Sequence, residues 1–395
     1  MKTSNAQTRI KVVHVLTDTN IGGAGTLLYN TIACGNTSRF EYVVVLPMGS
    51  RLIERLSTLP CRVLTVQGGR DRSFDMSAIS EYVRLFRRER PDIVHTHASF
   101  AARVAGRLSR VPVCIYTRHC VFPLEPWQKS VPFRFAFRQV SRLLSDRVVA
   151  VAEAARDQLI EMGMDGRQIE VIINGVLPVR PCRKAELDEL RQRLGLEQEQ
   201  FVVGMSARLE EYKGQGTLLR AVAMCRDQTP KMRVLLVGDG SCAVSYRQLA
   251  RELGIEDAVI FAGFVEDMAP YYAIMNVNVN ASFGTETSSL ALSEGMSAGV
   301  PCVASRYGGN PYMVREGENG FLFEPKNHAE LAQTLVRLYH DAALLARLSE
   351  GARRQYRERF GAERMTRSLE RLYTDAWRKR KGQSLHAHKG HPAAP

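Results

Sequence analysis

Short runs rich in Val, Ile and Leu recur along the chain, and a stretch with the periodicity of a helix follows each of them. The runs are apolar throughout rather than alternating with polar residues, which is typical of strands buried on both faces of a parallel sheet. They form a first series of VVHVL, YVVVL, RVLTV, DIVHT, VCIYT, RVVAV and IEVII, and a second series of FVVGM, RVLLVG, AVIFAG, VNVNA, PCVAS and GFLF. Two series of similar length predict an α/β protein with two doubly wound, Rossmann-like domains rather than one large sheet.

The junction between the two series is expected at residues 177–183, where LPVRPCR places two prolines in a short polar connection. We therefore predict an N-terminal domain over residues 1–178 and a C-terminal domain over residues 179–361. Residues 381–395 have the composition of a disordered basic tail.

A final helix is predicted at about residues 362–380. Its apolar residues recur with a period of 3.6, so one side of the helix should pack against another element. These residues are Met365, Leu369, Leu372, Tyr373, Ala376 and Trp377.

Composition excludes several classes of protein. With 395 residues, 45% of them hydrophobic, the chain can form two separate cores. No apolar run reaches the length of about 18 residues that a membrane-spanning helix needs. The first residues pass from polar positions directly into a strand-like run, without the apolar segment of a secretory signal. Eight scattered cysteines without a C-x-x-C pair indicate free thiols. We expect a cytoplasmic protein.

The positive charge is concentrated in the first half of the chain. Residues 1–180 contain 25 Lys and Arg against 15 Asp and Glu, whereas residues 181–395 contain 29 against 26. Within the first half, residues 103–147 hold nine basic residues, interleaved with Phe122, Trp127, Phe133, Phe135 and Phe137. Basic residues mixed with large apolar ones favour binding to an anionic membrane surface, at the inner face of the cell membrane. A solvated basic helix with an ordinary core face is the alternative, and nucleic-acid binding is disfavoured.

Two carboxylates, Glu286 and Glu294, flank a segment of small, hydroxyl and aliphatic residues. Thr287 or Ser288 is a plausible N-cap of a helix there, and Gly299 is a plausible end. On one ideal helix the two glutamates would lie about 12 Å apart along the axis. Glycosidase carboxylates lie about 5–9.5 Å apart, so this spacing does not fit paired acid–base catalysis.

The start of this predicted helix has no basic residue nearby, since residues 282–300 contain neither Lys nor Arg. Its free N–H groups could bind an anion, with a carboxylate on either side to accept hydroxyl groups. A diphosphate flanked by two sugars has this layout, so a nucleotide-sugar fits. Two ordinary glutamates on an ordinary helix remain the alternative.

Two further loops could bind phosphate. Arg208 and Lys213 follow the first strand of the second series, at the edge of a parallel sheet where ligands bind. Gly22 and Gly23 follow the first strand of the chain and would let backbone N–H groups approach a phosphate. The second loop is not a dinucleotide fingerprint, because Leu28 stands where a third small residue is needed.

We predict no metal and no cofactor. No two aspartates stand two positions apart, so the Asp-x-Asp metal clamp is missing. His95 and His97 could bind a metal ion, but two histidines alternating along a strand are expected to be one buried and one exposed.

Taken together, the motifs resemble those of family 4 retaining glycosyltransferases of the GT-B fold, in which two Rossmann-like domains face a central cleft. The resemblance covers nearly the whole chain. It rests on Glu286 and Glu294 with seven residues between them and on the GMSAGVPCVAS segment that follows. Further motifs stand in the family's order: Arg208 with Lys213-Gly214, Gly22-Gly23, IYTRH ending in His119, and Asn174-Gly175-Val176.

The resemblance implies a role for each of these positions. Arg208 and Lys213 would bind the diphosphate, Glu294 the ribose and Glu286 the hydroxyls of the donor sugar, while His119 would face that sugar. The remaining donor-binding residues would be Gly22, Gly23, Gly263, Phe264, Val265, Thr287, Ser288, Ser289 and Leu290. The helix at 362–380 would return to the first domain. Thr287-Ser288-Ser289 departs from the Gly-Phe-Gly that is common in the family, which leaves the donor sugar open.

The predicted activity is the transfer of a sugar, with retention of configuration and without a metal, from a nucleoside diphosphate to an acceptor hydroxyl. The acceptor would be a lipid-linked or other saccharide in the synthesis of cell-surface polysaccharide or glycolipid. A nucleotide-sugar epimerase of the same architecture and a non-catalytic basic binding module are the alternatives.

Overall fold

A computed structural model describes residues 9–70 and 74–382. The chain forms two compact units. The N-terminal unit comprises the described residues up to His119, Pro123–Asn174, and the residues from Ala362 onward; the C-terminal unit comprises Cys120–Phe122 and Gly175–Gly361. The predicted disordered tail lies almost wholly outside the described residues.

The N-terminal unit contains a seven-stranded sheet whose paired strands are all parallel, in the order β3-β2-β1-β4-β5-β6-β7. Its strands coincide with the seven apolar runs of the first series, because the β-branched residues in these runs favour the extended backbone of a strand. They are β1 Ile10–Leu16, β2 Phe40–Pro47, β3 Cys61–Val66, β4 Ile93–His97, β5 Val113–Arg118, β6 Arg147–Ala150 and β7 Ile169–Val171. The helices between them are α1 Gly23–Ala33, α2 Leu52–Leu56, α3 Ile79–Glu89, α4 Phe100–Leu108, α5 Val131–Leu144 and α6 Glu153–Glu161.

Residues alternate between the two faces of this sheet, and both faces are covered. One face carries Val13, Val43 and Val94, which form a core cluster with residues of α3 and α4. The other face carries His14, Tyr42 and His95 and packs against the last helix, α15 Ala362–Arg380.

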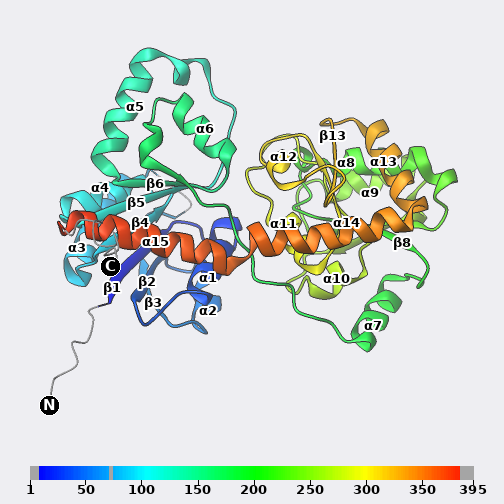
Figure 1. Cartoon of the computed structure of the whole chain (residues 1–395), viewed down its shortest axis with the longest axis horizontal. Helices are drawn as coiled ribbons and strands as arrows, with labels where there is room; N and C mark the ends of the chain where they lie inside the picture. Colours follow the sequence, from blue (N-terminus) through cyan, green and yellow to red (C-terminus); the bar gives the residue numbers. More distant parts are fainter. Residues whose placement is uncertain (1–8, 71–73, 383–395) are drawn as a thin grey trace, which may run out of the picture. The chain divides into compact units, whose positions relative to one another are not determined.

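Helix α15 joins the N-terminal unit although it comes last in the sequence (Figure 1). Its Glu370 accepts hydrogen bonds from the Tyr42 hydroxyl at 2.9 Å and from the Asn36 amide at 2.6 Å. Trp377 donates from its ring nitrogen to Asp92 at 3.0 Å, and the Tyr373 hydroxyl lies 2.7 Å from Nδ1 of His95. The apolar stripe predicted for this helix is thus buried on the first sheet.

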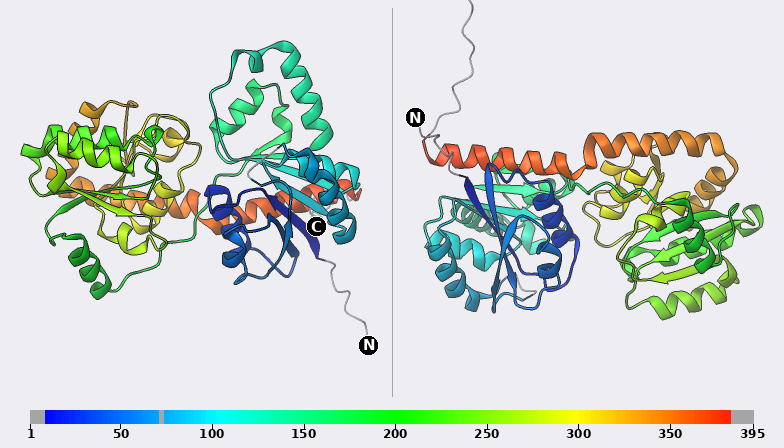
Figure 2. Two further views of the ribbon diagram at one scale, coloured as in Figure 1. Left: turned by 180° about the vertical axis from the view of Figure 1, so that it is seen from behind. Right: turned by 90° about the horizontal axis from the view of Figure 1, so that it is seen from below.

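The C-terminal unit contains a six-stranded sheet, also parallel in every pairing, in the order β10-β9-β8-β11-β12-β13. Figure 2 shows this unit in green to orange. Its strands are β8 Phe201–Ser206, β9 Met232–Val237, β10 Val259–Gly263, β11 Val277–Asn280, β12 Cys302–Ser305 and β13 Gly320–Phe323. Its helices are α7 Lys184–Leu194, α8 Gln215–Cys225, α9 Ala243–Glu252, α10 Ala269–Ile274, α11 Leu290–Ala298, α12 Asn310–Met313, α13 His328–His340 and α14 Ala342–Gln355. One sheet face packs on α8, α9, α13 and α14, and the other on α7 and α10.

Helix α5 departs from this pattern of burial, because Ser141 and Leu144 are the buried residues in its fourteen positions. Large apolar side chains are exposed there, including Val131 at 77%, Phe135 at 65% and Leu143 at 69%. Across the described residues, no helix is both long enough and apolar enough to cross a bilayer.

Candidate functional site

Glu286 is held by one of its two carboxylate oxygens. Oε2 accepts hydrogen bonds from Nζ of Lys213 at 3.1 Å, from Nδ2 of Asn280 at 3.0 Å and from Oγ of Ser282 at 3.1 Å. Charge-assisted hydrogen bonds of this kind fix both the position and the orientation of a carboxylate. Oε1 takes no part in these bonds, so the site offers one immobilised carboxylate oxygen to a ligand.

Residues 282–300 contain neither Lys nor Arg, but Glu286 has a cationic partner from another part of the chain. Lys213 lies 73 positions earlier, and its side chain and that of Glu286 are only 18% and 10% exposed. The two residues meet because β8 and β11 are adjacent in the sheet and both loops leave its carboxyl edge. Lys213 also donates to the Thr285 carbonyl at 3.3 Å, while Asn280 and Ser282 donate to Glu286 independently of Lys213.

The loop that carries Lys213 is shaped by a glycine. Gly214 has a φ of +81°, and a Cβ at this position would lie 2.1 Å from the carbonyl oxygen of Ala281, so only glycine fits without a shift. Arg208, on the same loop, is exposed and donates to the Tyr212 hydroxyl at 2.8 Å. Arg208 and Lys213 therefore both lie at the carboxyl end of β8.

Helix α11 begins next to Glu286, and its N-cap differs from the prediction. The cap is Ser289, whose hydroxyl accepts a hydrogen bond from the Leu292 amide, rather than Thr287 or Ser288. Thr287 instead accepts from the Val121 amide at 2.9 Å. The hydroxyl oxygen of Ser288 is buried and has no hydrogen-bond partner among the described residues.

Glu294 lies about one turn inside α11. Its Oε2 accepts a hydrogen bond from the Tyr272 hydroxyl at 3.0 Å. Burial, together with the negative charge of Glu294, raises the pKa of Tyr272 well above its ordinary value. The Tyr272 hydroxyl therefore stays protonated and holds Glu294 from one side.

A pair of glycines closes over the loop before α11. Gly308 has a φ of +57°, and a Cβ there would lie 1.9 Å from the carbonyl oxygen of Glu286. A Cβ on Gly309 would lie 1.8 Å from the carbonyl oxygen of Thr287, and the Gly309 amide donates to the Glu286 carbonyl at 3.0 Å. The backbone around Glu286 is thus fixed from two directions.

The predicted donor-binding residues Gly263, Phe264 and Val265 lie at the end of β10 and directly after it. Gly263 has a φ of +71°, which turns the chain at the carboxyl edge of the sheet. Phe264 is 74% exposed and Val265 is half-buried. An exposed aromatic ring at the ligand-binding edge is available for stacking.

The N-terminal unit holds the remaining predicted residues. Gly22 is the N-cap of α1 without a side-chain hydrogen bond, and Gly23 is the first residue of that eleven-residue helix. His119 directly follows β5 and is half-buried. Gly22, Gly23 and His119 therefore all lie at the carboxyl edge of the first sheet.

The prediction that His95 and His97 lie one buried and one exposed is wrong. They stand two positions apart on β4, so they share one face, and both are buried at 1% and 6% exposure. Together with His14 they form a group in which one nitrogen of each ring lies within 4.8 Å of the others. Every ring nitrogen of His95 and His97 already has a hydrogen-bond partner.

Sequence reasoning did not identify Asn280, Ser282 or Tyr272 as parts of the site. Asn278 and Asn280 are amides in an otherwise apolar, fully buried strand, and buried polar side chains need partners. That feature of VNVNA could have pointed to the carboxyl end of β11.

Similarities to known proteins agree with this architecture. Residues 21–180 match the family described as Glycosyltransferase Family 4, and residues 187–355 match Glycosyl transferases group 1. The 2-deoxystreptamine glucosyltransferase of Streptomyces kanamyceticus is 30% identical over 307 residues, which cover 72% of this chain and 77% of that protein. The UDP-Gal:alpha-D-GlcNAc-diphosphoundecaprenol alpha-1,3-galactosyltransferase of Escherichia coli is 26% identical over 310 residues, which cover 76% and 80%.

Among solved structures, HepE of Anabaena in complex with UDP superposes with a TM-score of 0.77 and 25% identity, over 93% of this chain and 100% of that chain. Two parallel-sheet α/β units and this similarity define a glycosyltransferase of the GT-B fold. The chain belongs to glycosyltransferase family 4, as the sequence motifs predicted.

Proposed function

We propose that the enzyme transfers a sugar from a nucleoside-diphosphate-sugar to an acceptor hydroxyl with retention of the anomeric configuration and without a metal ion. The observation that carries this proposal is the oriented carboxylate of Glu286, held against Lys213 beside the start of α11. The support is that a carboxylate able to accept hydroxyl groups, the ammonium group of Lys213 and the start of α11 lie next to one another. Membership of the glycosyltransferase family favours this activity over an epimerase or a passive basic module.

In the proposed site, the diphosphate lies between Arg208, Lys213 and the start of α11. The helix dipole and the two cations offset its charge, most strongly as the phosphate leaves. Glu286 receives the hydroxyls of the donor sugar through Oε1, and the orphaned hydroxyl of Ser288 supplies a further polar contact. Glu294 binds the ribose.

Other predicted donor contacts complete this proposal. The backbone at Gly263, Phe264 and Val265 would meet the base, and UDP in the HepE complex makes uridine the first candidate. The amides at Thr287, Ser289 and Leu290 would face the donor, Gly22 and Gly23 would approach the phosphate, and His119 would face the sugar.

The proposed reaction forms a bond between the acceptor oxygen and the anomeric carbon on the face from which the phosphate departs. The bond from that carbon to the phosphate oxygen breaks, and the proton of the acceptor hydroxyl passes to the leaving phosphate. Lys213 and Arg208 stabilise the charge on that phosphate before the proton arrives. This route assigns no side chain the part of a general base.

Donor hydrolysis tests the configuration and the metal requirement without knowledge of the acceptor. We expect the purified enzyme to cleave UDP-glucose, UDP-N-acetylglucosamine or GDP-mannose slowly with water, and to release the sugar first as the α anomer. Proton NMR before mutarotation reports the anomer, and EDTA should leave the rate unchanged. Initial release of the β anomer, or loss of activity in EDTA with recovery in magnesium, would contradict the proposal, and conversion of the donor into its epimer would favour the rival enzyme.

We further propose that the acceptor is a lipid-linked or cell-surface saccharide and that the enzyme works on the cytoplasmic face of the membrane. The support is the apolar surface of α5, where Val131, Phe135 and Leu143 are exposed among basic residues. The Escherichia coli relative acts, by its name, on a diphosphoundecaprenol-linked sugar. Insertion of apolar side chains beside Arg134 would bind the protein reversibly to anionic lipid.

Two valines with the same exposure provide a matched test of membrane binding. Val131 on α5 and Val244 on α9 are each 77% exposed. We expect the protein to co-sediment with phosphatidylglycerol vesicles but not with phosphatidylcholine vesicles. Val131→Asp should lower the bound fraction about tenfold, because burial of a valine is worth about 1.5 kcal/mol or more, whereas Val244→Asp should have no effect.

Reversing the charge of a basic residue on α5 provides a second test in the same vesicle co-sedimentation experiment. Arg134→Glu should weaken binding, whereas Arg138 and Arg142 are less informative because they already contact Gly163 and Asp165. If the protein ignores anionic vesicles, or if both valine variants bind equally, the membrane proposal is wrong while the transferase proposal stands.

A further inference from the structure

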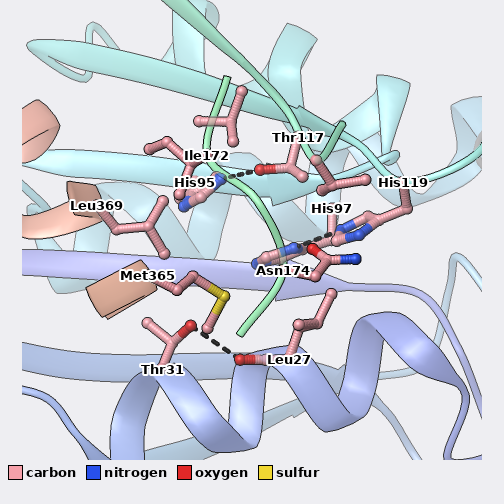
Figure 3. A pocket seen from close by; sticks show the side chains of 12 residues that line it. Leu27, Thr31, His95, His97, Thr117, His119, Ile172, Asn174, Met365 and Leu369 are labelled. Atoms are coloured by element: carbon pink, nitrogen blue, oxygen red, sulfur yellow. Dashed lines mark hydrogen bonds between the residues drawn. The ribbon is translucent and has the colours of Figure 1, made fainter. Parts of the chain in front are cut away.

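Three imidazoles in the N-terminal unit are joined end to end by hydrogen bonds. Nδ1 of His14 lies 3.1 Å from Nε2 of His97, and Nδ1 of His97 lies 2.9 Å from Nε2 of His119. His14 comes from β1, His97 from β4, and His119 directly follows β5; these strands are neighbours in the sheet. Figure 3 shows the link between His97 and His119 beside a cavity. We call these three residues the histidine chain.

All three rings are neutral at physiological pH. Burial lowers the pKa of His14 to about 3 and that of His119 to about 4, and it lowers the pKa of His97 well below its ordinary value. A neutral imidazole carries one N–H group and one bare nitrogen. Each hydrogen bond of the histidine chain needs one N–H group and one bare nitrogen. The position of the proton on one ring therefore fixes the positions of the protons on the other two rings. Two arrangements satisfy both bonds: every proton on Nδ1, or every proton on Nε2.

The ends of the histidine chain distinguish the two arrangements. Nε2 of His14 and Nδ1 of His119 are both buried, and neither has a hydrogen-bond partner among the described residues. His14 is 1% exposed, whereas His119 is half-buried and lines a cavity of about 20 Å³. Such a volume holds about one water molecule. A buried N–H without an acceptor is rarer than a buried acceptor without a donor, and His119, unlike His14, lines this cavity, where a water molecule could accept its N–H; the bare nitrogen therefore belongs on His14.

We propose that His14 and His97 are positioning residues that hold His119 in the tautomer protonated on Nδ1. His119 then directs an N–H donor, on a nitrogen that is buried, into the small cavity. A donor there suits an acceptor oxygen, whether of a water molecule or of the sugar, and would reject a ligand group that can only donate. The part that concerns the sugar rests on the function proposed above; the part that concerns the tautomer does not.

A metal site at His14, His95 and His97 is the competing interpretation. His95, however, is bonded through Nδ1 to the Tyr373 hydroxyl at 2.7 Å and through Nε2 to the Thr117 hydroxyl at 2.6 Å. A metal ion bound by His95 and His97 would have to break a hydrogen bond at each of these rings. The histidine chain instead keeps the hydrogen bonds at both nitrogens of His97. His95 therefore stands outside the histidine chain and serves as its control.

Nitrogen-15 NMR of the full-length protein at pH 7 tests the tautomer, because protonated and bare ring nitrogens have separate chemical-shift ranges. We expect Nδ1 to be the protonated nitrogen in His14, His97 and His119. His97→Gln, whose amide reaches the former Nε2 position, should release His119 into a mixture of tautomers. His97→Asn, whose amide reaches the Nδ1 position and can donate from its NH2 group to Nε2 of His119, should retain more of the Nδ1 tautomer than His97→Gln does.

Kinetics with a cleaved donor provide the second measurement. His97→Gln should lower kcat about tenfold with little change in KM, since one hydrogen bond of about 1.4 kcal/mol is lost. His97→Asn should recover most of that loss. His95→Gln lies on the same strand and is equally buried, but it should leave both the His119 tautomer and kcat unchanged.

Each outcome has a definite meaning. A His119 ring protonated on Nε2, or an unchanged His119 tautomer in His97→Gln, overturns the inference. Stoichiometric zinc that shifts the ring signals of His14 and His97 replaces the histidine chain with a metal site. A tautomer change without any change in kcat overturns the contact between His119 and the sugar, whereas an inactive parent enzyme with the expected tautomers counts against the proposed function alone.

Discussion

Lys213→Ala should lower kcat for donor cleavage by at least about 10²-fold, the cost of removing one preorganised donor from a developing negative charge. Lys213 lies at the carboxyl end of β8, and its ammonium group is 3.1 Å from Glu286. In the proposed reaction its ammonium group moves from the carboxylate to the leaving phosphate. Arg208→Ala should have an effect of the same order, and both should change KM less than kcat.

The control for this prediction is Lys231→Ala. Lys231 belongs to the same unit, its side chain is 60% exposed, and its ammonium lies 4.0 Å from the Glu199 carboxylate. An exposed pair of this kind contributes little, so activity should be retained. The folded state of Lys213→Ala should persist, because Asn280 and Ser282 still donate to Glu286. Full activity in both Lys213→Ala and Arg208→Ala would rule out the phosphate assignment.

Glu294→Ala should weaken binding of UDP about 10–10²-fold, as measured by isothermal titration. Two ribose hydroxyls that donate to a carboxylate are each worth about 1.5 kcal/mol or more. The effect should fall on affinity rather than on kcat at saturating donor, because the ribose is remote from the bond that breaks.

Tyr272→Phe tests the hydrogen bond to Glu294 separately from the Glu294 carboxylate itself. Tyr272 donates to Oε2 of Glu294 at 3.0 Å. Its loss should weaken UDP binding only a few-fold, since the negative charge of Glu294 remains. Unchanged affinity in Glu294→Ala would show that the ribose is bound elsewhere.

The strands were the most predictable part of the fold. Each strand corresponds to an apolar run that is visible locally, because β-branched residues favour a pleated, buried backbone whichever residues come after them. The apolar stripe on the last helix was equally predictable, because its 3.6-residue period is also visible within a short stretch of sequence. Fold class and family could therefore be predicted from the sequence and are confirmed.

The details that escaped prediction depend on contacts between distant parts of the chain. Thr287, Ser288 and Ser289 can all cap a helix, and Ser289 is chosen where Asn280 donates to its hydroxyl at 3.0 Å and Met313 meets its amide. The ion pair between Lys213 and Glu286 joins residues 73 positions apart. No local pattern contains either contact.

The histidines illustrate the same limit. His95 and His97 are polar, and nothing near them in the sequence indicates that both would be covered. They are buried because α15, from the other end of the chain, packs on their face of the sheet and brings Tyr373 to His95.

The return of α15 has a consequence for how the protein is made. The ribosome delivers all seven strands of the first sheet before Gly175–Gly361 of the second unit, yet Glu370, Tyr373 and Trp377 emerge only after that segment. At about 5–20 residues per second, the intervening unit takes on the order of ten seconds to synthesise. During that interval one face of the first sheet, with its buried histidines, lacks the part of its cover that α15 provides, while all residues of the second unit are present. The first sheet is translated before most of the second unit but gains its last helix after it. A premature stop codon just before α15 would therefore damage the N-terminal unit rather than the C-terminal unit.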